Sequence, residues 1–260
     1  MSQIQLAFLL SLVCVGALAL AGLRPYVDEF QRRWRQTLAA CLLVAILAVA
    51  VVAPVTAFGE WQDIDPDLIW FPTLFAGHVL LAGFLCAWWS LRGDLSIFKF
   101  LSLSSAQLGD KLRHGVRAGC GGWILTVMVT SASAGLVAAT GWMSEPTQIP
   151  PVMLWLAELP FLYKLVIVLV AMTVEEAFFR GFLQPRFGLI ISSALFAMSH
   201  FNYGLPFMIV GVFTISLVIG RAFERSGDLL PCIIAHGIFD SVQLLIILPW
   251  AVRMWPAVAG

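Results

Sequence analysis

Long apolar segments alternate with short polar segments along the whole chain. A helix that crosses the hydrocarbon core of a bilayer needs about 20 predominantly apolar residues. The pattern therefore predicts an all-α, polytopic membrane bundle of about eight transmembrane helices. The predicted spans are Ile4–Leu23, Thr37–Phe58, Leu68–Leu91, Val116–Thr140, Pro160–Leu183, Phe187–Phe201, Leu205–Gly220 and Leu229–Trp250.

The polar segments between these spans alternate in charge. Thirteen of the 15 Lys and Arg residues fall in or beside every second loop, and only Lys164 and Arg253 do not. The loop with Glu60, Asp63, Asp65 and Asp67 has no basic residue. Because basic residues collect on the cytoplasmic side, eight spans place both termini on the non-cytoplasmic side. No basic residue precedes the first apolar run, so we interpret it as a membrane helix and not as a signal peptide.

Composition supports this interpretation. The chain has 260 residues, of which 60% are hydrophobic and 12% are charged, about half the charged fraction of a soluble domain. Such a chain cannot cover a water-facing surface, which argues against a soluble enzyme, a disordered chain and a nucleic-acid partner. We expect a multi-pass protein of a cell membrane, the bacterial inner membrane, with the lipid bilayer as its surroundings.

Several ionisable residues lie inside the predicted spans of the C-terminal half. An ionisable residue within a membrane is costly and is by default a functional candidate. Glu175, Glu176, His200, His236 and Asp240 meet this condition on three separate helices. His78 also lies in a span, but no second polar group accompanies it, so we interpret it as a packed structural residue.

The spacing of these residues predicts two local pairs. Glu176 and Arg180 are four residues apart and share a helix face, which favours an ion pair that supports the helix. Glu175 points about 100° away and has no local partner, so it is the candidate general base. His236 and Asp240 also lie four residues apart on one face. Gly181 and Pro185 are expected to end the fifth span.

These residue types permit two kinds of hydrolytic chemistry. A Glu and a His that converge on one water molecule can deprotonate it, and His236 can stabilise the oxyanion that then forms. Glu175, His200 and His236 can equally hold a divalent metal such as zinc, which would activate the water itself. Residue types alone leave both open.

Three motifs in order resemble a known family. Glu-Glu-x-x-x-Arg at Glu175, Phe-x-x-x-His ending at His200 and His-x-x-x-Asp starting at His236 are similar to those of the CPBP, or Abi, family of CAAX-protease and bacteriocin-processing endopeptidases. The resemblance covers roughly Pro160–Leu248. It divides the chain into N-terminal membrane helices (1–158), catalytic core helices (159–252) and a tail (253–260).

The resemblance implies an intramembrane endopeptidase that cleaves membrane-embedded or lipid-modified protein or peptide substrates. It implies that Glu175 and His200 activate water, that His236 with Asp240 stabilises the oxyanion or helps hold the site, and that Glu176 and Arg180 give support. Members have been classed both as metalloproteases and as glutamate-dependent proteases. The family often has Asn where this chain has Asp240. An ionised Asp cannot donate a hydrogen bond, so Asp240 is expected to orient His236, to bind a cation or to be held protonated.

Two other classes of function fit the same residues. Buried Glu, His, Arg and Asp side chains also build proton relays, which would make the chain a proton-coupled membrane transporter. The chain can also be a non-catalytic membrane binding partner that holds a substrate without cutting it. Loss of peptide cleavage on replacement of Glu175 distinguishes the protease from both.

Overall fold

Every regular element in the described part of the chain is helical. The computed structural model describes residues 13, 15–17, 20–21, 29–56, 70–141, 151–200 and 206–258. Its elements are α2 (Arg33–Thr56), the 3-10 helix η4 (Phe71–Phe75), α3 (Ala76–Arg92), α4 (Ile97–Phe100), α5 (Leu108–Thr140), α6 (Pro151–Glu158), α7 (Phe161–Glu176), the π-helix η5 (Ala177–Leu183), α8 (Gln184–Ser199), α9 (Pro206–Ser226), α10 (Leu230–Val242), the π-helix η7 (Gln243–Ile247) and α11 (Leu248–Val258). The predicted all-α class is confirmed.

Within the described residues, four helical segments are long and apolar enough to cross a membrane. They are Arg33–Val51, Phe71–Arg92, Leu108–Thr140 and Leu230–Met254. A fifth results if α6 and Phe161–Ser199, which are bent by 112° relative to each other, count as one broken span. The chain is thus a multi-pass membrane protein by the length and composition of its helices. The first predicted span, Ile4–Leu23, lies largely outside the described residues.

Two helices extend beyond their predicted apolar windows. α5 begins at Leu108, well before Val116, and α9 continues past Gly220 to Ser226. The added turns contain Arg113 and Arg225, which an apolar window leaves out. A hydropathy window finds only the part of a helix that can lie in hydrocarbon, whereas the backbone hydrogen bonds continue into the polar boundary.

The predicted break between the fifth and sixth spans is in the wrong place. Gly181 lies inside η5, and Pro185 lies in the first turn of α8, which follows the π-helical turn directly. The helical path is interrupted at Gly188 instead, with φ 80° and ψ 171°. Glycine adopts this positive φ without a steric penalty. The segment from α7 to α8 therefore stays helical across the predicted boundary.

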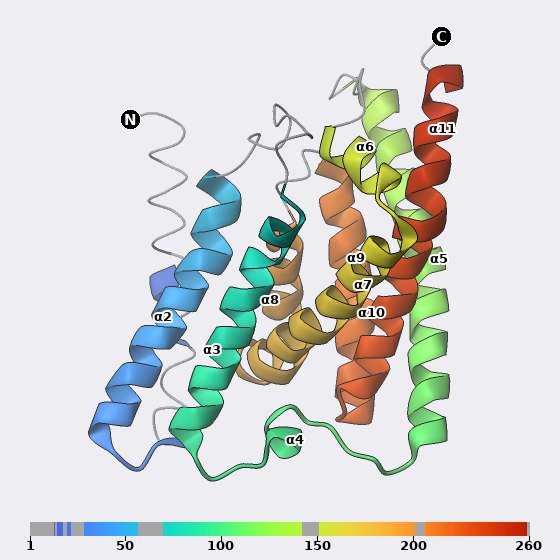
Figure 1. Cartoon of the computed structure of the whole chain (residues 1–260). Helices are drawn as coiled ribbons and strands as arrows, with labels where there is room; N and C mark the ends of the chain where they lie inside the picture. Colours follow the sequence, from blue (N-terminus) through green and yellow to red (C-terminus); the bar gives the residue numbers. More distant parts are fainter. Residues whose placement is uncertain are drawn as a thin grey trace, which may run out of the picture.

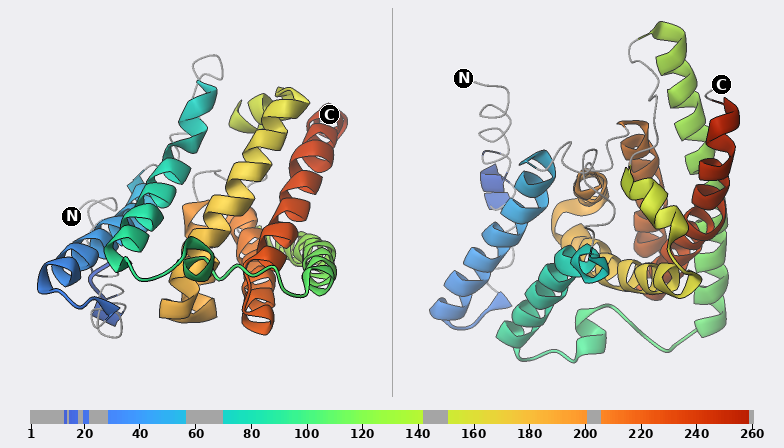
Figure 2. Two further views of the ribbon diagram at one scale, coloured as in Figure 1. Left: turned by 60° about the horizontal axis from the view of Figure 1, so that its bottom comes forward. Right: turned by 45° about the horizontal axis from the view of Figure 1, so that its top comes forward.

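The helices form two groups joined by α7, η5 and α8. α5, α9 and α10 contact one another on one side, while α2 and α3 lie on the other (Figure 1). α7 runs obliquely between the groups and contacts both α3 and α10, as the turned views in Figure 2 also show. Residues at the end of α7 are therefore within reach of helices from both halves of the chain.

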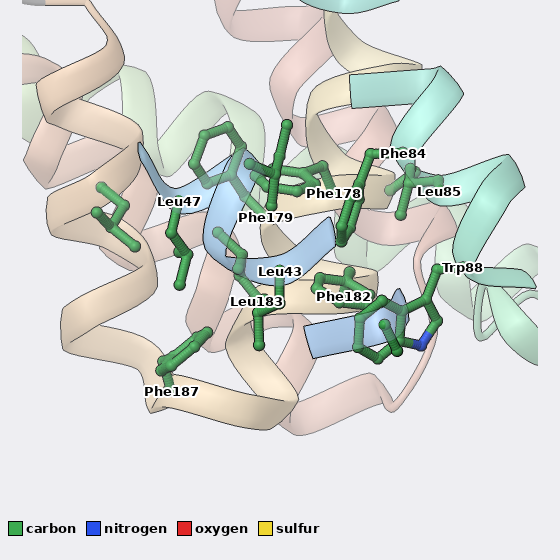
Figure 3. Packing of buried hydrophobic residues seen from close by; sticks show 14 of the residues in the cluster. Leu43, Leu47, Phe84, Leu85, Trp88, Phe178, Phe179, Phe182, Leu183 and Phe187 are labelled. Atoms are coloured by element: carbon green, nitrogen blue, oxygen red, sulfur yellow. The ribbon is translucent and has the colours of Figure 1, made fainter. Parts of the chain in front are cut away.

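A cluster of aromatic and aliphatic side chains packs α2 and α3 against η5 (Figure 3). The Phe182 ring centroid lies 4.8 Å from those of both Phe84 and Trp88, in edge-to-face geometry. Helix association in a membrane depends on such van der Waals packing, because lipid tails are as apolar as the side chains. This cluster fixes α3 beside the segment that follows Glu176. The labelled members are Leu43, Leu47, Phe84, Leu85, Trp88, Phe178, Phe179, Phe182, Leu183 and Phe187.

Asp228 connects two helix starts and a linker at one end of the bundle. Its Oδ2 accepts hydrogen bonds from Lys111 Nζ (2.5 Å) and from the backbone N–H of Ser104 (3.0 Å). Its Oδ1 accepts from the N–H of Leu230 at 2.9 Å. The carboxylate thus joins the start of α5, the linker before it and the start of α10, and its side chain is only 5% exposed.

We expect Asp228→Ala to destabilise the fold markedly. It leaves the mostly buried Lys111 ammonium without its carboxylate, and breaking a buried pair in this way costs about 3 kcal/mol or more. Thermal unfolding of the detergent-solubilised chain measures the change. Asp110→Ala is the matched control, because the Asp110–Arg113 pair is exposed on the surface of α5 and such pairs contribute little. Equal melting temperatures for the two variants would contradict this role of Asp228.

Candidate active site

The predicted site residues meet where α7, η5, α8 and α10 approach one another. Glu175 and Glu176 end α7, and Arg180 lies in the middle of η5. His200 directly follows the last residue of α8, while His236 and Asp240 lie in α10. The structure divides these side chains into a sealed group and an accessible group.

The sealed group is centred on Glu176. Its Oε2 accepts a hydrogen bond from Arg180 Nε at 3.1 Å, and its Oε1 lies 2.8 Å from His236 Nδ1. The other ring nitrogen of His236, Nε2, lies 3.2 Å from Asp240 Oδ2. Both predicted helix-face pairs are therefore in contact. The side chains of Glu176 and Arg180 are fully buried, so water has no access to their ion pair.

The charges in the sealed group balance. Both nitrogens of His236 face carboxylate oxygens, so with ionised carboxylates both nitrogens carry protons. Two carboxylates, one guanidinium and one imidazolium then sum to zero. This balance lowers the cost of burying Glu176, Arg180 and His236 in an apolar interior. Asp240 lies at the edge of the group and is 24% exposed. Arg180 also donates to Ser216 Oγ of α9 at 3.0 Å.

The accessible group is centred on Glu175. Its Oε1 lies 2.9 Å from His78 Nε2, and its Oε2 lies 4.0 Å from His200 Nε2. The side chains of Glu175, His78 and His200 are 12%, 19% and 21% exposed. Glu175 Oε2 is buried, and no described residue forms a hydrogen bond with it. The adjacent glutamates thus occupy different environments, as their angular separation on the helix predicts.

His200 is held in a defined tautomer when it is neutral. Its Nδ1 lies 2.8 Å from the carbonyl oxygen of Phe196, so Nδ1 carries the hydrogen and donates it. The lone pair is then on Nε2, the nitrogen that faces Glu175. Two hydrogen-bond acceptors, His200 Nε2 and Glu175 Oε2, are consequently 4.0 Å apart. A donor with two hydrogens, such as a water molecule, can bridge these two atoms.

The ring of Phe196 lies between the two groups. Its centroid is 4.8 Å from the ring of His200 and 5.7 Å from that of His236. The guanidinium carbon of Arg180 lies 5.1 Å from the same centroid, within the range of a cation–π interaction. Phe196 therefore packs against both histidines and covers the sealed ion pair.

A π-helical turn follows each acidic motif. η5 begins immediately after Glu176, and η7 begins shortly after Asp240. The wider turn changes the backbone hydrogen-bond pattern, and in η5 the carbonyl oxygen of Phe179 accepts a bond of 2.7 Å from the buried Ser192 hydroxyl. Short π segments are frequent at functional sites. The apolar pattern of the sequence contains no signal for them.

The sequence-based expectation that no second polar group accompanies His78 is wrong, because His78 contacts Glu175. α3 brings His78 Nε2 to 2.9 Å from Glu175 Oε1, although the two residues are 97 positions apart. The one available signal was that an ionisable residue in a span is a functional candidate.

The residues predicted to hold a metal do not form a ligand set. Among the described residues, no group of three or more His, Cys, Asp or Glu side chains is placed to hold a metal ion. His236, a proposed ligand together with Glu175 and His200, directs its ring nitrogens at Glu176 and Asp240 instead. The arrangement therefore does not fit the predicted zinc site, and we derive no step through a metal.

Taken together, the fold and the site are those of a multi-pass helical membrane protein with a carboxylate–histidine centre enclosed by its helices. Residues 157–242 match the family of Rce1-like type II CAAX prenyl endopeptidases. The chain thus carries a domain of this protease family, and the expected resemblance to CPBP proteins is confirmed. The match includes the Glu175, His200 and His236 motifs but not His78.

A stretch of 69 residues is 39% identical to the uncharacterized protein YpbD of Bacillus subtilis (strain 168). It covers 26% of this chain and 36% of the relative, so the chain spans only about a third of that protein. No solved structure matches the chain.

Proposed function

We propose that the chain is an intramembrane endopeptidase that cleaves membrane-embedded or lipid-modified protein or peptide substrates. The observation that carries this proposal is that Glu175 Oε2 and His200 Nε2 face each other at 4.0 Å, on side chains that are 12% and 21% exposed. The matched family contributes the reaction class, because its description names prenyl endopeptidases. Prenylated C-terminal peptides are therefore the first substrates to test.

In the proposed mechanism, Glu175 and His200 hold one water molecule between them. The water donates one hydrogen toward Glu175 Oε2 and the other toward His200 Nε2, and the proton on the Glu175 side passes to Glu175 as the oxygen attacks the carbonyl carbon of the substrate. The carbonyl oxygen becomes an oxyanion. When the C–N bond breaks, the proton on Glu175 moves to the leaving amine, and the carboxylic acid product forms.

The role proposed for His236 depends on Asp240. The imidazolium brings positive charge close to the site, but its two N–H groups lie on Glu176 and Asp240. For His236 Nε2 to donate a hydrogen bond to the oxyanion, the Asp240 side chain therefore has to move away from it. Asp240 is 24% exposed, which leaves it room to move. We propose that Asp240 orients His236 before the substrate binds.

The proposal also includes the topology predicted from the loops. Eight spans with both termini on the non-cytoplasmic side would make the site open toward the cytoplasm, in a bacterial inner membrane. The catalytic core would comprise residues 159–252, preceded by N-terminal membrane helices over 1–158 and followed by a short tail. The alternating charge of the loops supports this arrangement.

The decisive variant is Glu175→Gln. It keeps the size of the side chain but removes the base, and loss of a general base lowers the rate about 100-fold or more. Cleavage of a farnesylated C-terminal peptide by the full chain in nanodiscs, followed by mass spectrometry, measures the loss. Glu158→Gln changes an exposed acid at the end of α6 and should leave the rate unchanged. Full cleavage by Glu175→Gln would exclude the mechanism, and proton flux without any cleavage by the native chain would favour the transporter.

The contact with His78 predicts a difference between two amide substitutions. The side-chain nitrogen of Gln reaches the position of histidine Nε2, whereas that of Asn reaches only the position of Nδ1. His78→Gln should therefore keep the hydrogen bond to Glu175 and retain kcat within a few-fold. His78→Asn should lower kcat about 10-fold or more through misplacement of Glu175, with KM unchanged in both. Equal losses in the two variants would refute the positioning role of His78.

The orienting role of Asp240 predicts that charge at this position is dispensable. Asp240→Asn retains an oxygen that accepts from His236 Nε2 and should keep kcat within a few-fold of the native value. Asp240→Leu has a similar size but no acceptor, and we expect a decrease of about 10-fold. If Asp240→Asn is as impaired as Asp240→Leu, the carboxylate charge itself is required, and the orienting role is wrong.

A further inference from the structure

An arginine-lined cavity lies between α5, α8 and α9, apart from the site described above. Its volume is about 970 Å³. Arg113 and Arg117 line it from α5, and Arg221 and Arg225 line it from α9. Each pair has the spacing of one helix face, so two rows of guanidinium groups border the same space.

The positive charge in this cavity is poorly compensated. Asp110 is the one carboxylate among the described lining residues. It pairs with Arg113, and Glu224 pairs with Arg221, each within its own helix. Arg117 and Arg225 form no ion pair with any described residue. Like charges that share a cavity repel each other, and a bound anion would remove this repulsion.

Contacts on two sides of the cavity fix the placement of α5 relative to α9. On one side, Gly122 of α5 lies so close to α9 that a Cβ atom there would be 2.7 Å from Ile215 Cδ1 and 3.1 Å from Val218 Cγ1. On the other side of the cavity, Lys111 donates a hydrogen bond to Asp228, which follows α9. Val218 also lines the cavity. The helix packing therefore sets the distance between the two rows of arginines.

Apart from His114, the remaining lining is apolar. Leu189, Ile190, Leu217 and Val218 contribute aliphatic side chains, and Ile190 is 61% exposed. The arginines lie toward the ends of α5 and α9 that the Lys111–Asp228 bond holds together, and α5 is long enough to cross a membrane. Guanidinium groups bind phosphate in bidentate geometry. A phosphate beside an aliphatic wall at a helix end matches the headgroup region of a phospholipid.

We propose that this cavity binds the headgroup of an anionic phospholipid, with the phosphate between the arginines of α5 and α9. The glycerol and the first acyl carbons then lie on the aliphatic wall. Such a lipid joins α5 to α9 and should stabilise the fold. This inference does not depend on the proposed peptidase activity.

The test measures lipid binding to the full chain in detergent. We expect native mass spectrometry to show phosphatidylglycerol adducts and thermal unfolding to shift upward, with phosphatidylcholine giving neither effect. The double variant Arg117→Gln/Arg225→Gln should bind phosphatidylglycerol at least about tenfold more weakly, since charge-assisted hydrogen bonds are lost. Arg32→Gln/Arg33→Gln is the matched control, because these exposed arginines lie at the start of α2 and outside the cavity.

A second double variant and two soluble phosphate compounds complete the test. Arg117→Lys/Arg225→Lys keeps both charges but loses the bidentate geometry. We expect intermediate affinity, in a chain whose charge balance is unchanged. Glycerol 3-phosphate and inorganic phosphate test a soluble source of the same chemistry. Stabilisation by either of them equal to that by phosphatidylglycerol would overturn the lipid assignment. Unchanged phosphatidylglycerol binding in the Gln double variant would overturn the site.

Discussion

The buried carboxylate of Glu176 is the constraint on which the site depends. A carboxylate removed from water is costly unless its oxygens are bonded to opposite charge. Glu176 meets this requirement with Arg180 on its own helical segment and with His236 on α10. Rotation or sliding of α7 against α10 would break one of these bonds and leave a charge without compensation. The network therefore fixes how the two helices are placed relative to each other.

The position of Glu175 follows from this constraint. Adjacent residues on a helix point about 100° apart, so fixing Glu176 toward α10 directs Glu175 toward α3 and the end of α8. There it meets His78 and His200, all three side chains being between 12% and 21% exposed. The buried carboxylate of Glu176 thus orients α7, and the carboxylate of Glu175 is left to take part in the proposed chemistry. Exchanging the two environments would give a base that no substrate can reach.

The sequence predicts the local contacts of the site well and the long-range contacts poorly. Glu176 with Arg180 and His236 with Asp240 follow from helical periodicity alone, and both pairs are in contact. The bond between His78 and Glu175 does not follow, because no periodic pattern relates residues on separate helices. The same limit applies to Gly188, where the helix breaks, since Gly181 and Pro185 offered equally good local signals. Apolar windows likewise missed the polar ends of α5 and α9.

Helices outside the matched segment 157–242 complete its site. The partner of Glu175 Oε1 comes from α3, and α3 is held in place by the edge-to-face contacts of Phe84 and Trp88 with Phe182 in η5. The π-helical turn that follows the glutamates is thus also the surface on which α3 docks. η5 thus influences both the direction of Glu175 and the position of His78. A substitution in the aromatic cluster of α3 and η5 would therefore alter the geometry of the Glu175 carboxylate, although no motif residue is changed. The N-terminal half of the chain is therefore part of the candidate active site and not only its membrane anchor.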